Sequence, residues 1–114
     1  MGQMIQSGNE LIRINTQKNS IEYSTNNGFS WHSRYTGTQA GIFVDLLSYG
    51  SEILACTSKG VYYSNNDGLS WHSRYSGTQA GSFLQLVSDG QNILATTSKG
   101  VYYSSNKGLS WHRR

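Results

Sequence analysis

The residues best suited to chemistry lie in a polar segment that occurs twice in the chain. It reads Arg-Tyr-Thr-Gly-Thr-Gln from Arg34 to Gln39 and Arg-Tyr-Ser-Gly-Thr-Gln from Arg74 to Gln79. A guanidinium, an aromatic ring, hydroxyls and an amide in one loop offer fixed hydrogen bonds and a stacking surface, both of which a sugar ring requires. The candidate ligand-binding residues are therefore Arg34, Tyr35, Thr38, Gln39, Arg74, Tyr75, Thr78 and Gln79.

Two lysines complete this candidate site, and a second interpretation stands beside it. Lys59 and Lys99 occupy tight Ser-Lys-Gly turns, where they could contact an anionic sugar or simply be solvated. The two polar segments could instead shape the joint between neighbouring units of the fold, with each arginine pairing across that joint. The sequence leaves both roles open.

The remaining polar residues do not indicate catalysis or a metal site. Glycoside hydrolysis commonly needs two carboxylates held about 5 to 10 Å apart, yet no acidic residue recurs at an equivalent place in a second repeat. A three-histidine zinc site needs converging ligands, whereas His32, His72 and His112 lie one per repeat. We expect a protein that is not an enzyme and holds no metal or cofactor. The acidic residues are Glu10, Glu22, Asp45, Glu52, Asp67 and Asp89.

These side chains must be positioned by a tandem repeat of about 40 residues. Trp31, Trp71 and Trp111 mark its period, and the first copy aligns with the others if two extra residues are allowed near Lys18 and Asn19. Each copy contains four short β-branched or aromatic runs separated by Gly-containing turns, which predicts an antiparallel four-stranded unit. We place the three units at about 1–36, 37–76 and 77–114.

Composition agrees with an all-β protein and excludes several classes of partner. The chain has 13 Gly, no Pro, eight Tyr and a charged fraction of only 13%, with its net charge of +3 spread along the sequence. No basic cluster indicates a nucleic-acid-binding face. The N-terminal residues lack the features of a signal peptide, and no apolar run could span a bilayer. We therefore expect no membrane insertion, and a location in the cytoplasm or export by another route.

The turn between the third and fourth strand of each unit resembles the Asp-box, or BNR, repeat of sialidases and several lectin-like propellers. The box pattern is Ser-x-Asp-x-Gly-x-x-Trp, but Asn replaces Asp in all three copies, which puts any charge or metal role in doubt. The resemblance implies a β-propeller in which this turn lies on the face away from the usual ligand site. The box residues are Ser24, Asn26, Gly28, Trp31, Ser64, Asn66, Gly68, Trp71, Ser104, Asn106, Gly108 and Trp111.

Three blades leave two sheet faces uncovered, because propellers close with about four to eight blades. We therefore predict a six-bladed ring completed by homodimerisation, with a nine-bladed trimer as a rarer possibility. The other interpretation is that the three blades are a piece of a larger or engineered repeat protein.

Two functions follow from this architecture. The first is a lectin-like propeller that binds glycans at repeated weak sites, which together raise the overall affinity. The second is a structural or protein-interaction scaffold, such as an assembly factor or a virion or surface component.

Overall fold

The structure is a computed structural model that describes residues 3–77 and 79–114, with Thr78 among the residues outside it. Its described part contains three four-stranded antiparallel sheets in which neighbouring strands follow chain order. The prediction of an all-β chain built from three four-stranded units is confirmed.

The first sheet comprises β1 (Met4–Ser7), β2 (Glu10–Asn15), β3 (Ser20–Ser24) and β4 (His32–Tyr35). The second comprises β5 (Phe43–Tyr49), β6 (Glu52–Thr57), β7 (Gly60–Ser64) and β8 (His72–Tyr75). The third comprises β9 (Phe83–Ser88), β10 (Ile93–Thr97), β11 (Gly100–Ser104) and β12 (His112–Arg113).

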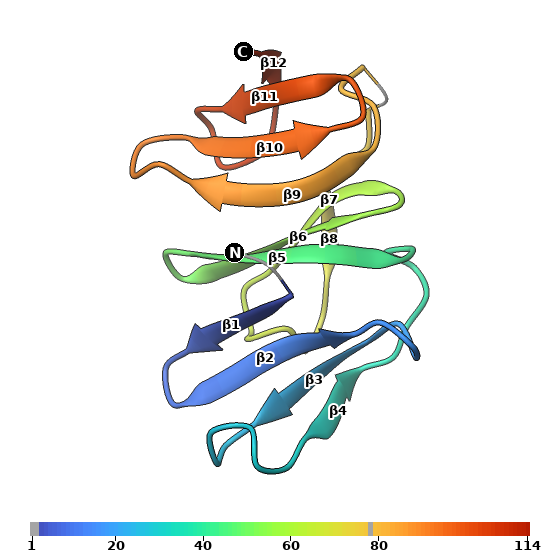
Figure 1. The fold of residues 1–114 in the computed structure, drawn as a ribbon, viewed down its shortest axis with the longest axis vertical. Coiled ribbons are helices and arrows are strands. Elements are labelled where there is room, and N and C mark those ends of the chain that lie inside the picture. The colour runs from blue at the N-terminus through green and yellow to red at the C-terminus, as the bar shows by residue number, and fades with distance from the viewer. Residues whose placement is uncertain (1–2, 78) are drawn as a thin grey trace.

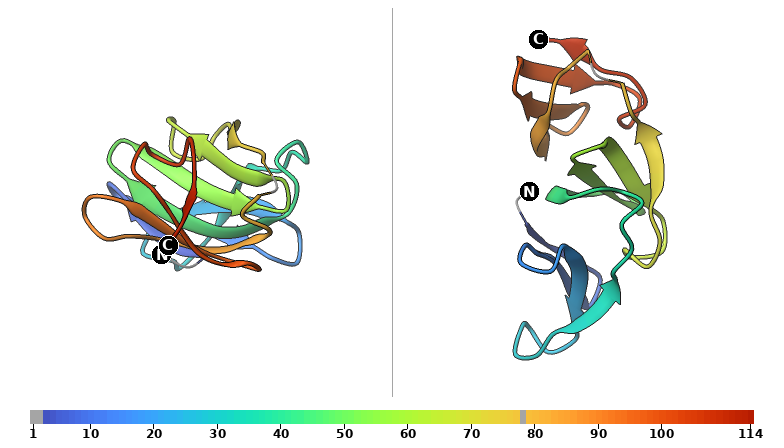
Figure 2. Two further views of the ribbon diagram at one scale, coloured as in Figure 1. Left: turned by 90° about the horizontal axis from the view of Figure 1, so that it is seen from above. Right: turned by 90° about the vertical axis from the view of Figure 1, so that its right-hand side faces the viewer.

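The three sheets, which we call blades 1 to 3, stack face to face along the long axis of the molecule (Figure 1). Their first strands, β1, β5 and β9, lie next to one another, so the blades fan out from a common inner edge (Figure 2). Long connectors join the outer strand of one blade to the inner strand of the next. No helix is present in the described part of the chain, and hence none that could cross a membrane.

An aromatic pair fills each of the two joints between blades. In the first joint the rings of Phe43 and Trp71 meet edge to face at 5.3 Å, and in the second Phe83 and Trp111 meet at 5.2 Å. Each tryptophan faces the preceding blade, because its box turn packs on that blade. The single cysteine, Cys56, is buried in the second joint, and this burial raises the pKa of its thiol to about 12.

The three box turns have one geometry, set by a buried serine and the asparagine that follows it. In blade 2 the Ser64 hydroxyl accepts a hydrogen bond from the Gly68 N–H at 2.8 Å and donates to Asn66 Oδ1. Asn66 Oδ1 also accepts from the Ser70 N–H at 3.0 Å. Gly68 adopts a φ of 89°, a conformation that glycine reaches without steric cost. Asn therefore makes the bonds that this turn needs without bringing in a charge.

The burial pattern distinguishes the middle blade from its neighbours. Five consecutive residues of β6, from Ile53 to Thr57, are buried because blade 2 is covered on both faces. In β10 buried residues alternate with more exposed ones, which is the pattern of a sheet covered on one face. Blades 1 and 3 each therefore present one uncovered face.

One position shows the difference directly. Ile21 of blade 1 and Val61 of blade 2 occupy equivalent sites facing the next blade, and both are 0% exposed. Val101 occupies the same site in blade 3 and is 45% exposed. The apolar side chain is present in blade 3, but no blade of this chain covers it.

Candidate functional site

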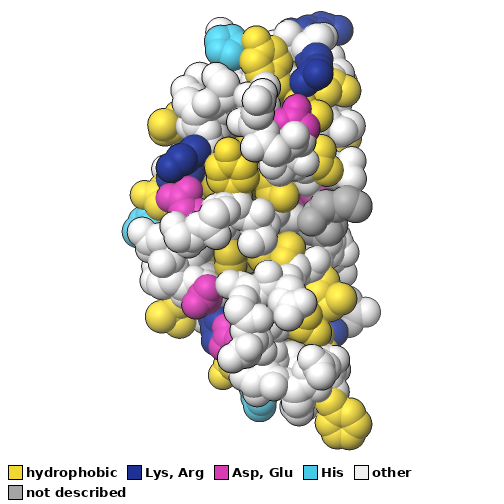
Figure 3. Space-filling view, turned by 90° about the vertical axis from the view of Figure 1, so that its left-hand side faces the viewer, with side chains coloured by type: hydrophobic (Ala, Val, Ile, Leu, Met, Phe, Trp, Pro, Cys, Tyr) yellow, Lys and Arg dark blue, Asp and Glu magenta, His cyan; other side chains and the backbone are white. Residues whose placement is uncertain are grey.

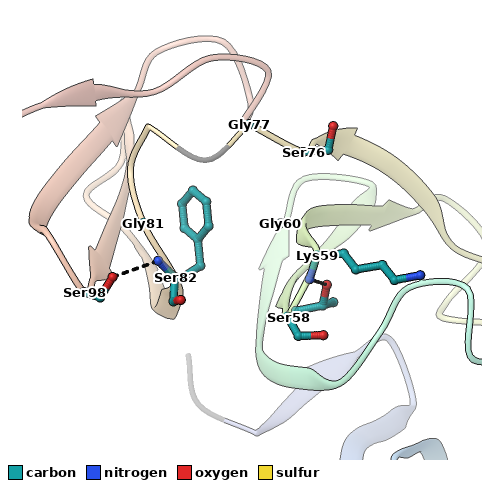
Figure 4. A pocket seen from close by; sticks show the side chains of 10 residues that line it. Ser58, Lys59, Gly60, Ser76, Gly77, Gly81, Ser82 and Ser98 are labelled. Atoms are coloured by element: carbon teal, nitrogen blue, oxygen red, sulfur yellow. Dashed lines mark hydrogen bonds between the residues drawn. The ribbon is translucent and has the colours of Figure 1, made fainter.

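The connector between blades 2 and 3 borders a pocket of about 250 Å³. One side is formed by the turn from Thr57 to Gly60, and the other by Gly81, Ser82 and Phe83 of the connector together with Ser98. The Ser82 N–H donates to the Ser98 hydroxyl at 2.9 Å, which fixes the edge of the pocket (Figure 4). The pocket therefore lies at the end of the joint formed by the connector and by the turn between the second and third strands of each blade. Of the described candidate residues, Lys59 lines it.

Arg34 and Arg74, which the sequence placed in loops, lie instead in the outer strands β4 and β8, and their side chains extend to the opposite end of the blades. Arg34 forms a bidentate ion pair with Glu10 at 2.6 and 2.8 Å and stacks over the ring of Tyr23 at 3.8 Å. It also donates to the carbonyl oxygen of Asp67, in the box turn of the next blade, at 3.1 Å. The sequence left two roles open for Arg34, namely contact with a ligand and contact across the joint between blades. In the structure its guanidinium makes contacts across the joint.

Arg74 repeats these contacts one blade further along. It pairs with Glu52 at 2.7 and 2.9 Å, stacks over Tyr63 at 4.0 Å and donates to the carbonyl oxygen of Lys107 at 3.1 Å. Both guanidinium side chains are largely buried. Charged side chains of opposite sign accordingly lie side by side on the face seen in Figure 3, between separate hydrophobic patches.

Two glutamates occupy equivalent places in blades 1 and 2, contrary to the expectation that no acidic residue recurs. Glu10 and Glu52 begin equivalent strands and hold equivalent arginines, so an acidic residue does recur in a second blade. The two residues lie 42 positions apart, which is the 40-residue period plus the two extra residues before Ser20. The hydrogen bond from the paired arginine is the main cause that lowers the pKa of each glutamate.

Replacing Glu52 with Gln should lower the free energy of unfolding by about 2 kcal/mol at pH 7, because Arg74 loses its charged partner. A carboxylate whose pKa is lower in the folded chain stabilises the fold above its unfolded pKa, and loses this effect as the pH falls through the folded pKa. Since the pKa of Glu52 lies below its ordinary value of 4.5, the variant and the wild type should converge below that pH. Urea unfolding at a series of pH values measures the difference in the free energy of unfolding between the two proteins.

Asp67→Asn is the control for this variant, because it removes a charge without depriving an arginine of its partner. A difference between Glu52→Gln and the wild type that stays constant at all pH values would contradict the prediction.

The other candidate residues lie in three different settings. Tyr35 and Tyr75 pack edge to face on Phe43 and Phe83, both at 5.9 Å, and so contribute to the joints. The exposed candidates are Thr38, Gln39, Gln79, Lys59 and Lys99. Thr78 lies outside the described residues.

Main-chain carbonyl groups of two candidate residues, Gln39 and Gln79, tie the connectors to the adjacent blade. The carbonyl oxygen of Gln39 accepts hydrogen bonds from Lys59 Nζ at 3.2 Å and from the Tyr62 hydroxyl at 3.3 Å. The Tyr102 hydroxyl makes the corresponding bond to the Gln79 carbonyl oxygen at 3.3 Å. The amide side chains of Gln39 and Gln79 point to solvent, where a ligand could reach them.

The histidines and the carboxylates have structural partners. His32, His72 and His112 each lie against a tyrosine of the adjacent strand, with ring centroids 5.5 to 5.6 Å apart. The described residues contain no group of three His, Cys, Asp or Glu side chains that could hold a metal ion. Each of the six acidic side chains takes part in an ion pair or hydrogen bond within the fold.

Comparison with known proteins supports the architecture. No protein-family model matches the sequence, and no curated protein matches it either. Among solved structures the chain is similar to the GH74 enzyme of Niastella koreensis, with a TM-score of 0.61 and 19% sequence identity. The similarity covers 92% of this chain and 17% of that enzyme's chain. Because the identity is low, it bears on the fold alone, and that enzyme is a β-propeller. The chain therefore has an all-β, propeller-like fold of three blades.

Proposed function

We propose that this protein is a non-catalytic, carbohydrate-binding β-propeller with sites at the connector end of its interblade joints. The observation that carries the proposal is the open pocket between blades 2 and 3, which is bordered by serine hydroxyls and main-chain polar groups. Hydroxyl and amide groups around a shallow pocket suit the many hydroxyls of a sugar.

Binding without hydrolysis is the better fit to the carboxylates. The structural neighbour is a carbohydrate-active propeller enzyme, but here Glu10 and Glu52 are held by arginines and Glu22 by Arg13. Burial alone would raise the pKa of Glu22, yet hydrogen bonds from Asn15 and Arg13 outweigh it and leave that pKa below its ordinary value. A carboxylate fixed in this way is a poor general acid near neutral pH.

The proposal includes a homodimer that closes a six-bladed ring. The open face of blade 3, which includes Val101, would meet the open face of blade 1, which includes Trp31. Arg114 occupies the place that Arg34 and Arg74 have in the other blades, so its guanidinium would donate to the Asn27 carbonyl oxygen of the second copy. A twofold axis makes this joint twice and leaves no blade uncovered.

A protein-interaction scaffold is the second candidate, and one observation favours it. Three large apolar side chains project from the box turns: Phe29 is 91% exposed, Leu69 59% and Leu109 58%. They recur once per blade, and exposed apolar groups of this kind are common at protein-binding surfaces.

A glycan array, probed with protein whose solution mass has been measured by light scattering, tests the proposal. Binding to a related set of sugars by material of twice the chain mass is expected. If the same material binds no glycan on the array, the carbohydrate proposal is refuted and the scaffold is favoured. The Phe29, Leu69 and Leu109 side chains would then be the first to mutate in pull-down experiments.

A further inference from the structure

The two joints of the chain differ at the connector end, although their cores are alike. In the first joint, the side chain of Asn19 enters the space between blades 1 and 2. Its Oδ1 accepts a hydrogen bond from the Phe43 N–H at 2.9 Å, and its Nδ2 donates to the Gly41 carbonyl oxygen at 3.0 Å. The extra residues of this turn place Asn19 there, with a φ of 52° that Asn tolerates better than most residues.

The second joint has the same two main-chain groups but no asparagine that bonds to them. The equivalents of the Phe43 N–H and the Gly41 carbonyl are the Phe83 N–H and the Gly81 carbonyl, and both residues border the pocket. The shorter turn of blade 2 has Lys59 at the corresponding place, and its ammonium is bonded to the Gln39 carbonyl oxygen. No side chain of residues 3–77 or 79–114 bonds to the Phe83 N–H or the Gly81 carbonyl oxygen.

Asn19 therefore shows what the open pocket can bind. It presents one hydrogen-bond acceptor and one donor on adjacent atoms, and the main chain pairs with both. Vicinal hydroxyls of a pyranose carry the same combination, because each hydroxyl can accept or donate. The hydroxyl of Ser98 accepts a hydrogen bond from the Ser82 N–H and donates none within residues 3–77 and 79–114, so its proton can bond to a third sugar oxygen.

We propose that the joint between blades 2 and 3 is a sugar subsite in which vicinal hydroxyls of a pyranose bind the Phe83 N–H and the Gly81 carbonyl. In the joint between blades 1 and 2, Asn19 occupies the equivalent subsite and closes it. This inference rests on the proposed carbohydrate-binding function and adds where one sugar binds and how many bind per chain.

The test uses the amide signals of the full-length protein in two-dimensional NMR during titration with methyl glycosides of glucose, mannose and galactose. In the wild type the Phe83 N–H signal should shift while the Phe43 N–H signal stays, with one site per chain. In Asn19→Gly, where glycine keeps the positive φ, both signals should shift and the number of sites should double. Asn27→Gly is the matched control, because Asn27 also has a positive φ of 62° but is exposed on a box turn. It should behave as the wild type.

A second variant closes the open subsite. Exchanging residues 58–60 for the five residues 16–20 should abolish the shift at Phe83 while leaving the box turns unchanged. Glycosides whose hydroxyls are O-methylated accept but do not donate, so they should bind at least tenfold more weakly. Acetamide is the comparison for a carboxamide ligand, and a shift at Phe83 with acetamide but with no sugar would overturn the inference.

Failure of the inference can be told apart from failure of the proposed function. The subsite would be refuted if the protein binds on the glycan array but the NMR signal of the Phe83 N–H does not shift. It would also be refuted if Asn19→Gly binds as many sugars per chain as the wild type. Either result would leave the proposed carbohydrate-binding function standing. No binding on the array and no NMR shift with any glycoside would refute both.

Discussion

Replacing Trp71 with Ala is expected to lower the free energy of unfolding by about 3 to 5 kcal/mol, the usual cost of truncating a buried aromatic side chain. Trp71 is only 6% exposed and lies between blades 1 and 2. Its indole N–H donates to the Gly68 carbonyl oxygen at 3.0 Å, so the variant also removes a bond that closes the box turn. Urea denaturation followed by circular dichroism measures the change, and a loss below 1 kcal/mol would contradict the packing described for this joint.

Trp31→Ala is the informative companion to this variant. Trp31 holds the same position in blade 1 but is only partly buried, since no preceding blade of this chain covers it. In a lone chain its truncation should cost clearly less than that of Trp71, whereas in a closed dimeric ring the two costs should be similar. The comparison therefore reports whether the open face of blade 1 is covered in solution.

Val101→Asp is expected to convert the proposed dimer into single chains. A carboxylate at this position would have to be buried in the joint with the second copy, and burying an unpaired charge costs several kcal/mol. Light scattering should show the mass falling from two chains to one, and the melting temperature, which in the wild type should rise with protein concentration, should become independent of it.

The control for this variant is Leu69→Asp, which puts the same charge on an exposed box turn away from both open faces. It should leave the mass and the concentration dependence unchanged. A wild-type protein that has the mass of one chain, and melts at the same temperature at all concentrations, would refute the dimer before any variant is made.

The fold was predictable because its signals are local and repeated. The spacing of Trp31, Trp71 and Trp111 gave the period, and the turns that contain Gly marked the four short strands that the structure has in each unit. Ser and Asn at fixed places in each box turn determine its hydrogen bonds from within eight residues, so no knowledge of distant contacts was needed.

The site was less predictable because it depends on contacts between blades. The sequence placed Arg34 in a connector, whereas it lies in β4, and a long side chain on this strand can reach either end of the blade. Its contacts with Glu10 and the Asp67 carbonyl oxygen decide between the two ends. The role of Asn19 was equally hidden. The two extra residues of its turn were visible as an irregularity of the repeat, but what they fill is a space made by the next blade.

The contacts of Arg34 and Arg74 also bear on how such an array can change in length. Each arginine donates to a main-chain carbonyl 33 residues further along the chain, in a turn that every repeat contains. Because the acceptor is a main-chain group, it survives any change of the side chain at that place, such as Asp67 in one repeat and Lys107 in the next. Gene duplication can thus add a unit, and recombination can remove one, without a new contact having to evolve.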